Sequence, residues 1–221
     1  MLTSLTISEL TIYLERQING FFPDNKKYII LEDIISLALE KVQFNFQHMK
    51  LDYFFKNNQV YFNHLNADQY TIFIYYASNI AYEYFDNIEL ATKLFYLNKI
   101  LHGFHCMYDT KLPDIFLVIH GNGIVLGKAK YSNYFVVMHG VTVGSNSKWE
   151  SPTLGERLVM YPNSSLLGKS IIANGNCFSN GSLLSDFNTV ENSLIIDKSP
   201  NLIIKKQTND KSKIYFRGKN E

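Results

Sequence analysis

The chain has 221 residues, a formal net charge of +1 at pH 7, 46% hydrophobic and 19% charged residues. Its basic residues are scattered, which excludes the electrostatic footprint of a nucleic-acid-binding surface. The apolar stretch 71–85 is interrupted by polar residues, so no membrane span is expected, and the N-terminus lacks the pattern of a signal peptide. Cys106 and Cys177 form no paired motif and are expected to be thiols in the reducing cytoplasm.

The first hundred residues carry helical patterns. Thr6 followed by Glu9 forms a capping box, Asn66 followed by Gln69 gives a second start signal, and residues 86–87 break the run between two later helices. The apolar stripes at helical spacing are Leu31, Ile35, Leu39, Val42 and Phe46, then Ile72, Tyr76, Ile80 and Tyr84, then Ile88, Ala91, Phe95 and Ile100. These stripes predict core or subunit-interface positions rather than a ligand site.

A six-residue spacing of apolar side chains dominates the second half of the chain. The residues that keep this spacing are Leu154, Met160, Leu166, Ile172, Phe178, Leu184, Val190 and Ile196. Small or polar side chains follow four residues after several of them, at Ser164, Ser170, Asn176, Ser182 and Asn188. The spacing continues upstream through Val143 and Val137 and, after a slip of one residue, Tyr131 and Leu126. A period of six fits neither a helix nor a single strand, but it is typical of short strands stacked in coils.

The sequence therefore predicts an α+β protein in which a helical domain precedes a left-handed parallel β-helix of hexapeptide repeats. The predicted boundaries are 1–104 for the helical domain, 105–206 for the β-helix and 207–221 for a charged tail. Residues 56–58 predict a turn inside the first domain. The tail after Lys206 lacks the six-residue spacing and is expected to be exposed.

The residues at the start of the β-helix carry a more specific pattern. Residues 117–127 place His120 in an apolar strand, followed by two glycines. Taken alone, a histidine in such a strand is more often structural. The segment resembles, however, the D-H-x-T-G-I/V-V-I/V-G segment of the serine O-acetyltransferase family of hexapeptide acyltransferases, and His120 falls on the family's catalytic histidine. Val141–Gly144 matches the family's V-T-L-G, and the resemblance extends from about Tyr70 to Lys206.

This resemblance implies direct transfer of acetyl from acetyl-CoA to a hydroxyl, without a metal. His120 would act as general base, and backbone N–H groups would stabilise the oxyanion. Family enzymes build the site between subunits of a trimer, so a homotrimer is expected, with the helical half able to join two trimers. By position, Gly144, Pro162 and Asn180 would line the cofactor cleft, although Pro162 and Asn180 fit ordinary turn positions equally well.

The departures from the family pattern concern the acceptor. Where the family has R-H-P, whose arginine binds the serine carboxylate, this chain has Glu150, Ser151 and Pro152. The family's acidic residue before the catalytic histidine is here Ile119. A glutamate would repel a carboxylate, so L-serine is a disfavoured acceptor. Trp149, Glu150 and Ser151 suit a sugar or surface-polysaccharide precursor, unless the loop 145–152 is merely a solvated connection.

The group that orients His120 is left open by the sequence. The family uses an aspartate fifteen residues upstream, and that position is here His105. A neutral imidazole would stabilise the developing imidazolium less than a carboxylate does. The alternatives are that His105 orients His120, that Asp109 or Asp114 supplies the carboxylate, or that His105 is structural.

Two other functions remain as alternatives. A zinc enzyme of the γ-carbonic anhydrase type would use His105, His120 and His139, but their spacing differs from that family's. A non-catalytic trimeric scaffold or regulatory subunit would explain the missing aspartate and arginine. The short tail differs from the family's inhibitory C-terminus, so no feedback control is expected.

Overall fold

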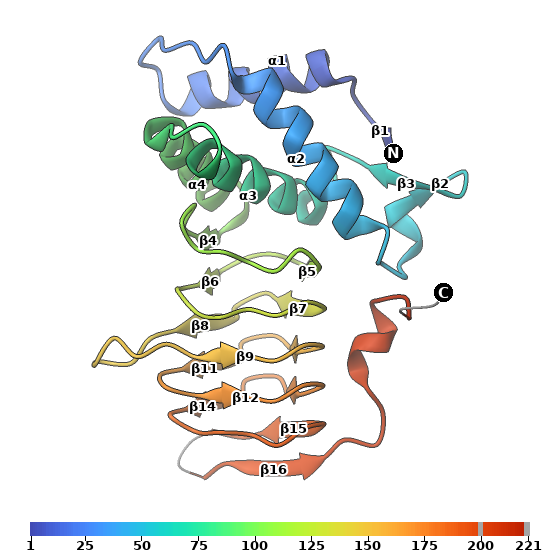
Figure 1. The fold of residues 1–221 in the computed structure, drawn as a ribbon, viewed down its shortest axis with the longest axis vertical. Helices are drawn as coiled ribbons and strands as arrows, with labels where there is room; N and C mark the ends of the chain where they lie inside the picture. Colours follow the sequence, from blue (N-terminus) through green and yellow to red (C-terminus); the bar gives the residue numbers. More distant parts are fainter. Residues whose placement is uncertain (199–200, 219–221) are drawn as a thin grey trace.

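The structure, a computed structural model, describes residues 1–198 and 201–218. Positions 199–200 and 219–221, which fall within the predicted β-helix and tail, lie outside the described residues. Figure 1 shows a helical half stacked on one end of a parallel β-helix of about five turns, as the sequence predicts. The four α-helices of this half are α1 (Ile7–Phe21), α2 (Leu31–Phe46), α3 (Ala67–Glu83) and α4 (Ile88–His102). In the described ranges, no helix combines the length and apolar character that crossing a membrane requires.

The predicted helix starts are confirmed. The Thr6 hydroxyl accepts a hydrogen bond from the Glu9 N–H at 3.3 Å, and the Glu9 carboxylate accepts one from the Thr6 N–H at 2.8 Å. At the start of α3, the Asn66 side chain accepts from the Gln69 N–H at 3.1 Å. These bonds satisfy N–H groups that have no partner within the first turn of a helix, and they fix where α1 and α3 begin.

The core face is predicted correctly in α2 and only in part in α4. All five residues of the predicted α2 stripe are buried. In α4, Ala91 is buried as predicted, but Ile88 and Ile100 are exposed, and Leu90, Leu94 and Leu97 complete the face that packs. Both stripes have helical spacing, so the contacts of α4 with α3, α1 and β4 decide which of its faces is buried.

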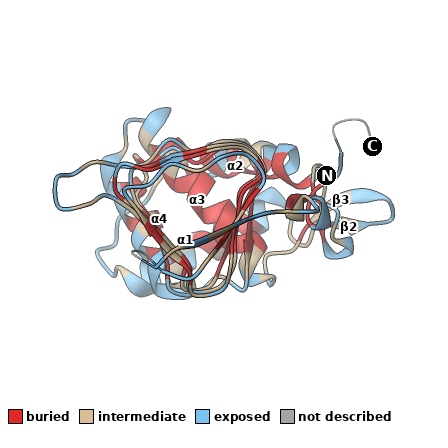
Figure 2. Ribbon diagram, turned by 90° about the horizontal axis from the view of Figure 1, so that it is seen from below, coloured by how far each residue is buried: buried red, intermediate tan, exposed pale blue. Residues whose placement is uncertain are grey.

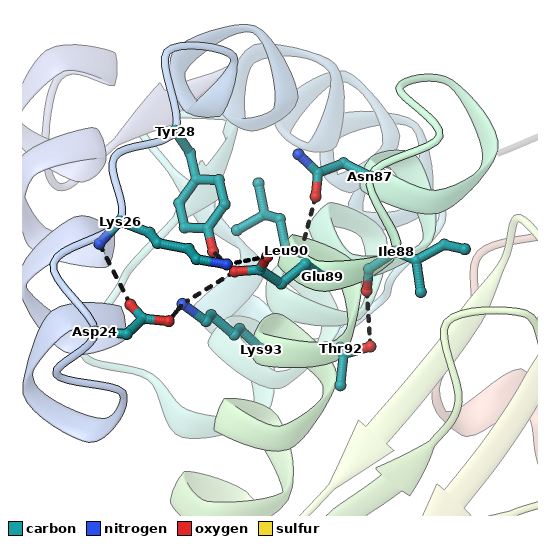
Figure 3. Close-up of polar contacts among 9 residues, drawn as sticks. All are labelled: Asp24, Lys26, Tyr28, Asn87, Ile88, Glu89, Leu90, Thr92 and Lys93. Carbon is teal, nitrogen blue, oxygen red and sulfur yellow. Dashed lines mark hydrogen bonds and ion pairs between the residues drawn. The ribbon is translucent and has the colours of Figure 1, made fainter.

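A charge network joins the connection between α1 and α2 to α4 (Figure 3). Lys93, whose side chain is only 9% exposed, donates to the Asp24 carboxylate, and its ammonium group lies 5.3 Å from the ring centroid of Tyr28. Glu89 accepts hydrogen bonds from Lys26 and Tyr28. Burial alone would lower the pKa of Lys93, but its bonds to Asp24 and Tyr28 prevail and raise it. A buried cation is tolerated here because it is paired.

A small sheet lies beside the helices, at the right of Figure 1. Its strands are β1 (Leu2–Thr3), β2 (Phe55–Lys56) and β3 (Gln59–Phe62), and a short 3₁₀ helix, η1 (Asp52–Phe54), precedes β2. The predicted turn is confirmed: Asn57 and Asn58 have φ of 52° and 58° and connect the antiparallel strands β2 and β3. Asparagine tolerates this left-handed backbone better than most residues.

The β-helix has three faces, which give it the triangular outline in Figure 2. The first face contains β4 (Phe104–Cys106), β6 (Ile124–Leu126), β8 (Thr142–Gly144), β11 (Ser165–Leu167) and β14 (Leu183–Ser185). The second contains β9 (Thr153–Leu154) and β12 (Ile171–Ile172). The third contains β5 (Phe116–Ile119), β7 (Phe135–Met138), β10 (Val159–Met160), β13 (Cys177–Phe178) and β15 (Ser193–Ile196), with β16 (Ile203–Lys206) antiparallel to β15.

The six-residue spacing is confirmed from Leu154 to Leu184, where every predicted apolar residue is buried. It is wrong at the last two positions, since Val190 is 75% exposed and Ile195 is buried in place of Ile196. The cause is the length of the last coil. Met160 pairs with Phe178, 18 residues on, whereas Phe178 pairs with Ile195, 17 residues on.

The small residues between the apolar positions complete the corners of the coils. Ser164, Ser170 and Ser182 are buried, and each hydroxyl donates to the carbonyl three residues earlier, at 2.7, 3.0 and 2.8 Å. A buried hydroxyl without such a partner would be destabilising. Asn188 differs because it is exposed, and its side chain accepts from the Ile171 N–H at 2.9 Å.

The tail does not have the predicted exposed character. After β16 it returns alongside the β-helix to the helical half (Figure 1), through a 3₁₀ helix, η2 (Lys211–Ile214). Tyr215 and Phe216 are buried, and the Lys50 N–H donates to the Tyr215 carbonyl at 2.8 Å. The Arg217 guanidinium lies 4.2 Å from the centre of the Phe55 ring. Two aromatic side chains therefore dock a segment whose charged composition suggested solvent.

Candidate functional site

His120 lies at a corner of the β-helix, between β5 on the third face and β6 on the first. Its side chain is exposed, and the ring takes part in no hydrogen bond within residues 1–198 and 201–218. Its backbone has φ of 52°, the left-handed region that non-glycine residues rarely adopt. An accessible imidazole with both nitrogens open can exchange a proton with a bound hydroxyl.

The strand register stacks further predicted residues beneath His120. Ile119 pairs with Met138, so the next residue, His139, follows His120 one coil down. Continuing the pairing of β7, β10 and β13 places Pro162 and Asn180 in the same column. Backbone bonds of 2.9 Å tie these corners together, from the Asn163 N–H to the His139 carbonyl and from the Gly181 N–H to the Pro162 carbonyl. Residues 120–123, 139–140, 162–163 and 180–181 are called the histidine corner below.

Gly144 lies at the opposite edge of the first face, at the end of β8. It is followed by the loop 145–152, which projects from the β-helix at the left of Figure 1 and of Figure 2. Residues 144–152, 168–169 and 186 are called the loop corner. Within one chain, the structure brings His120, Pro162 and Asn180 together and leaves Gly144 on another edge.

The loop corner is held together by Asn146. Its side-chain amide donates to the Glu150 and Asp186 carboxylates, both at 2.9 Å, and its oxygen accepts from the Lys148 and Glu150 N–H groups. Hydrogen bonds from the Lys169 N–H and the Asn146 amide lower the pKa of Asp186. The neck of the loop is therefore ordered, which gives Glu150 a defined position.

The other predicted acceptor residues face solvent. At the tip of the loop, Trp149 is 87% exposed and has φ of 62°. Ser151 is also exposed, and Pro152, which follows it, is buried. An aromatic side chain this exposed is available to a ligand or to another copy of the chain.

The predicted orienting groups form no hydrogen bond with the His120 ring within the described residues. The His105 ring packs edge-on against Phe95, with ring centroids 5.1 Å apart, and no hydrogen bond joins it to His120 in the described ranges. Burial, and then the charge of Lys99, lowers the pKa of His105.

The two aspartates considered as alternatives are paired elsewhere. Asp109 is bound to Lys128 at 2.8 Å, and its second oxygen is buried without a hydrogen bond. Asp114 lies 3.6 Å from Lys41 of α2. The orientation of His120 by His105 therefore stays a prediction, without a ring contact to support it.

A residue that the sequence did not single out does reach this corner. Asp68, in the first turn of α3, accepts the His120 N–H at 2.9 Å and the Gly121 N–H at 2.8 Å. In the sequence, an aspartate just after the helix cap Asn66 reads as an ordinary first-turn acid. No local pattern links it to a corner 52 residues away.

The three histidines of the zinc alternative do not form a metal-binding group. Among the residues that the structure describes, no three His, Cys, Asp or Glu side chains converge as such a site requires. The alternative therefore gains no support from the geometry.

The sequence matches no protein-family model and no curated protein. Solved structures do resemble it. The serine acetyltransferase of Vibrio cholerae has a TM-score of 0.71 at 15% identity, over 92% of this chain and 81% of the other. The soybean serine acetyltransferase apoenzyme has a TM-score of 0.70 at 15% identity, over 91% of this chain and 84% of the other. A serine acetyltransferase in complex with CoA has a TM-score of 0.64 at 15% identity, over 91% of this chain and 86% of the other. The chain therefore has the fold of the serine acetyltransferases.

Proposed function

We propose that this protein is an acetyl-CoA-dependent O-acetyltransferase in which His120 is the general base. The observation that carries the proposal is the exposed imidazole of His120, unpaired within the described chain, at a corner of a serine acetyltransferase fold. Support for the cofactor comes from a structural neighbour of the same fold that is complexed with CoA. Cys106 and Cys177 are both buried and carry free thiols, in keeping with the proposed cytoplasmic location.

The proposed reaction is a direct transfer. The acceptor oxygen attacks the thioester carbon while the His120 imidazole takes the hydroxyl proton. The C–S bond then breaks, and the departing sulfur of CoA receives that proton from the imidazolium, which returns His120 to its neutral form. The oxyanion between these steps needs donors. The N–H groups of His120 and Gly121 are occupied by Asp68, whereas those of Asn122 and Gly123 donate to no acceptor in the described residues.

The site is proposed to form between copies of the chain in a homotrimer. In one chain the histidine corner and the loop corner lie on different edges of the β-helix. A cleft that uses Gly144 together with Pro162 and Asn180 needs the loop corner of one copy beside the histidine corner of the next. Pairing of two trimers through the helical half is the further expectation. A monomeric mass by light scattering at micromolar concentration would contradict this assembly.

The acceptor is proposed to be a neutral polyhydroxyl compound, such as a sugar in a surface-polysaccharide precursor. The Glu150 carboxylate is held by a hydrogen bond from Asn146 and lies 3.9 Å from the Lys169 ammonium. Such a group accepts hydrogen bonds from sugar hydroxyls and repels a substrate carboxylate. Trp149 offers an exposed aromatic face, and Ser151 a hydroxyl, beside it.

The test is thiol release from acetyl-CoA with L-serine, free sugars and nucleotide sugars as acceptors. We expect turnover with a sugar. In His120→Ala, kcat should fall about 10²–10⁴-fold while acetyl-CoA binding is retained. His139→Ala is the comparison variant, because it removes the imidazole one coil below. A larger loss there would move the base to His139. Turnover on L-serine alone would overturn the proposed acceptor, and the absence of both turnover and CoA binding would favour a scaffold.

A further inference from the structure

Asp68 connects the helical half to the histidine corner through backbone contacts. One carboxylate oxygen accepts the His120 N–H at 2.9 Å and the other accepts the Gly121 N–H at 2.8 Å. Hydrogen bonds to a charged acceptor are about twice as strong as neutral ones. The two bonds hold consecutive peptide groups at the position where His120 adopts its left-handed backbone, with φ of 52°. A strained conformation of this kind persists only where its surroundings fix it.

The residue that follows His120 has no room for a side chain. A Cβ atom on Gly121 would lie 3.4 Å from the Asp68 carboxylate and 2.7 Å from the Val118 side chain. The approach to Val118 is too close for any side chain, so packing against β5 requires glycine in the backbone segment that Asp68 holds.

The position of Asp68 is itself fixed by the start of α3. Asn66 caps the helix, and the buried Gln69 side chain accepts from the Asn63 N–H at 2.7 Å and donates to the Tyr53 carbonyl at 3.1 Å. A carboxylate in the first turn is also favoured by the helix dipole. Asp68 thus stands on a rigid element.

The end of α4 approaches Asp68 without neutralising it. The His102 ring shares a hydrogen bond of 2.7 Å with the Asn98 side chain, whose amide donates to the Thr71 carbonyl at 3.0 Å. Burial lowers the pKa of His102 to about 4, and the charge of Asp68 opposes that shift. At neutral pH His102 is uncharged, so the Asp68 carboxylate is left to the two N–H groups.

We propose that Asp68 is the positioning residue for the candidate base, holding His120 through its main chain rather than through its ring. The inference rests on the proposed function, because it takes His120 as the base. It explains how the imidazole can be held at the corner although none of His105, Asp109 and Asp114 contacts its ring. Errors of about 1 Å in the position of a catalytic group can cost about 10²-fold in rate.

The test compares Asp68→Asn with Asp68→Glu and with Asp33→Asn as the matched control. Asp33 is an exposed acid in the first turn of α2, so its replacement removes the same charge from the same kind of helix position. Asparagine has one acceptor oxygen, and its NH₂ group would oppose the second N–H. We expect kcat to fall about 10–100-fold in Asp68→Asn, with the KM for acetyl-CoA within about twofold of wild type. Glutamate should restore part of kcat, and Asp33→Asn should leave it unchanged.

A second measurement does not depend on turnover. Amide hydrogen exchange at His120 and Gly121 should be at least about tenfold faster in Asp68→Asn, while exchange at Val118 in β5 stays as in wild type. Faster exchange throughout β5 would indicate general unfolding and overturn the positioning role.

The outcomes separate this inference from the proposed function. If wild type turns over and Asp68→Asn keeps its kcat, positioning by Asp68 is wrong and His120 as base stands. If wild type releases no thiol with any acceptor, the proposed function fails and the role of Asp68 in it fails too. If exchange at the His120 and Gly121 amides is unchanged in Asp68→Asn, Asp68 does not hold these two N–H groups, and the positioning role is wrong whatever the activity.

Discussion

The histidine corner and the loop corner are built from the same repeat but are supported differently. The histidine corner depends on the helical half, because Asp68 of α3 binds the backbone of His120. The loop corner depends on the β-helix itself, because Asn146 ties the loop to Asp186 two coils below. The difference suggests a division of roles. The corner anchored from outside the repeat holds the proposed base, and the self-contained corner is free to vary with the acceptor.

The largest expected effect on kcat is at the histidine corner, in the variant Gly121→Ala. The added Cβ would lie 2.7 Å from the buried Val118 side chain, so either this side chain or the backbone that Asp68 holds must shift. Such overpacking costs about 1–3 kcal/mol, and a displaced His120 should lose about 10²-fold in kcat. Steady-state kinetics and urea unfolding measure both quantities. A Gly121→Ala variant with wild-type kcat would show that catalysis does not depend on the backbone geometry that Asp68 holds at His120.

The loop corner is tested by Glu150→Arg, with Glu150→Gln as the control for loss of charge. A guanidinium can bind a substrate carboxylate through two hydrogen bonds, worth about 1.5–3 kcal/mol. We expect kcat/KM for L-serine to rise about 10–100-fold in Glu150→Arg, and to rise less in Glu150→Gln. Thiol release with both acceptor classes provides the measurement. If neither variant changes acceptor preference, the loop is a solvated connection and the acceptor is selected elsewhere.

The sequence predicts the buried positions that the six-residue repeat sets. It does not predict the features that depend on contacts between distant segments. The inward positions from Leu154 to Leu184 follow from a period of six, since each coil repeats the environment of the one before. The prediction fails at Val190 and Ile196, where the last coil is one residue short. Val190 and Ile196 nevertheless happen to be apolar at the six-residue positions of the sequence, so only the strand pairing reveals the missing residue.

The candidate site shows the same limit. His120 is singled out by the resemblance of its segment to that of the serine O-acetyltransferases, and the strand register places Pro162 and Asn180 in line with it. Asp68 was missed because its contact joins two segments 52 residues apart. The docked tail was missed for a similar reason, since Phe216 is buried only against the helical half and the β-helix. Contacts between repeat and non-repeat regions leave no periodic signal in either region.

Acid should lower the stability of the helical half, which supports the histidine corner, through His102 at the end of α4. Burial lowers the pKa of His102 to about 4 from its ordinary 6.5. Between these values the unfolded chain binds a proton at this position that the folded chain does not, so the free energy of unfolding falls as the pH falls from 6.5 to 4. Above pH 6.5 the group contributes no pH dependence.

The variant His102→Gln should remove this dependence. We expect the difference in unfolding free energy between wild type and variant to change by about 1–2 kcal/mol between pH 7 and pH 4, a value reduced for partial exposure of the ring. Urea unfolding at several pH values measures it. Parallel pH profiles for the two proteins would show that His102 is not held neutral in the folded chain.

The smallest expected effect belongs to Gly144→Ala, which asks whether the loop corner contributes to the cofactor cleft at all. A Cβ at this position would meet only Leu167, at an ordinary contact distance of 3.5 Å, so the fold should tolerate it. Gly20→Ala is the matched control, because a Cβ at Gly20 meets no atom within 4 Å. If pantetheine lies against the backbone of Gly144, the added methyl should raise the KM for acetyl-CoA about three- to tenfold, equivalent to about 1 kcal/mol. The midpoint of urea unfolding should stay near that of wild type, since the change neither strains the backbone nor opens a cavity. An unchanged KM would confine the cofactor to the histidine corner, and the cleft would then need no loop corner from a second copy.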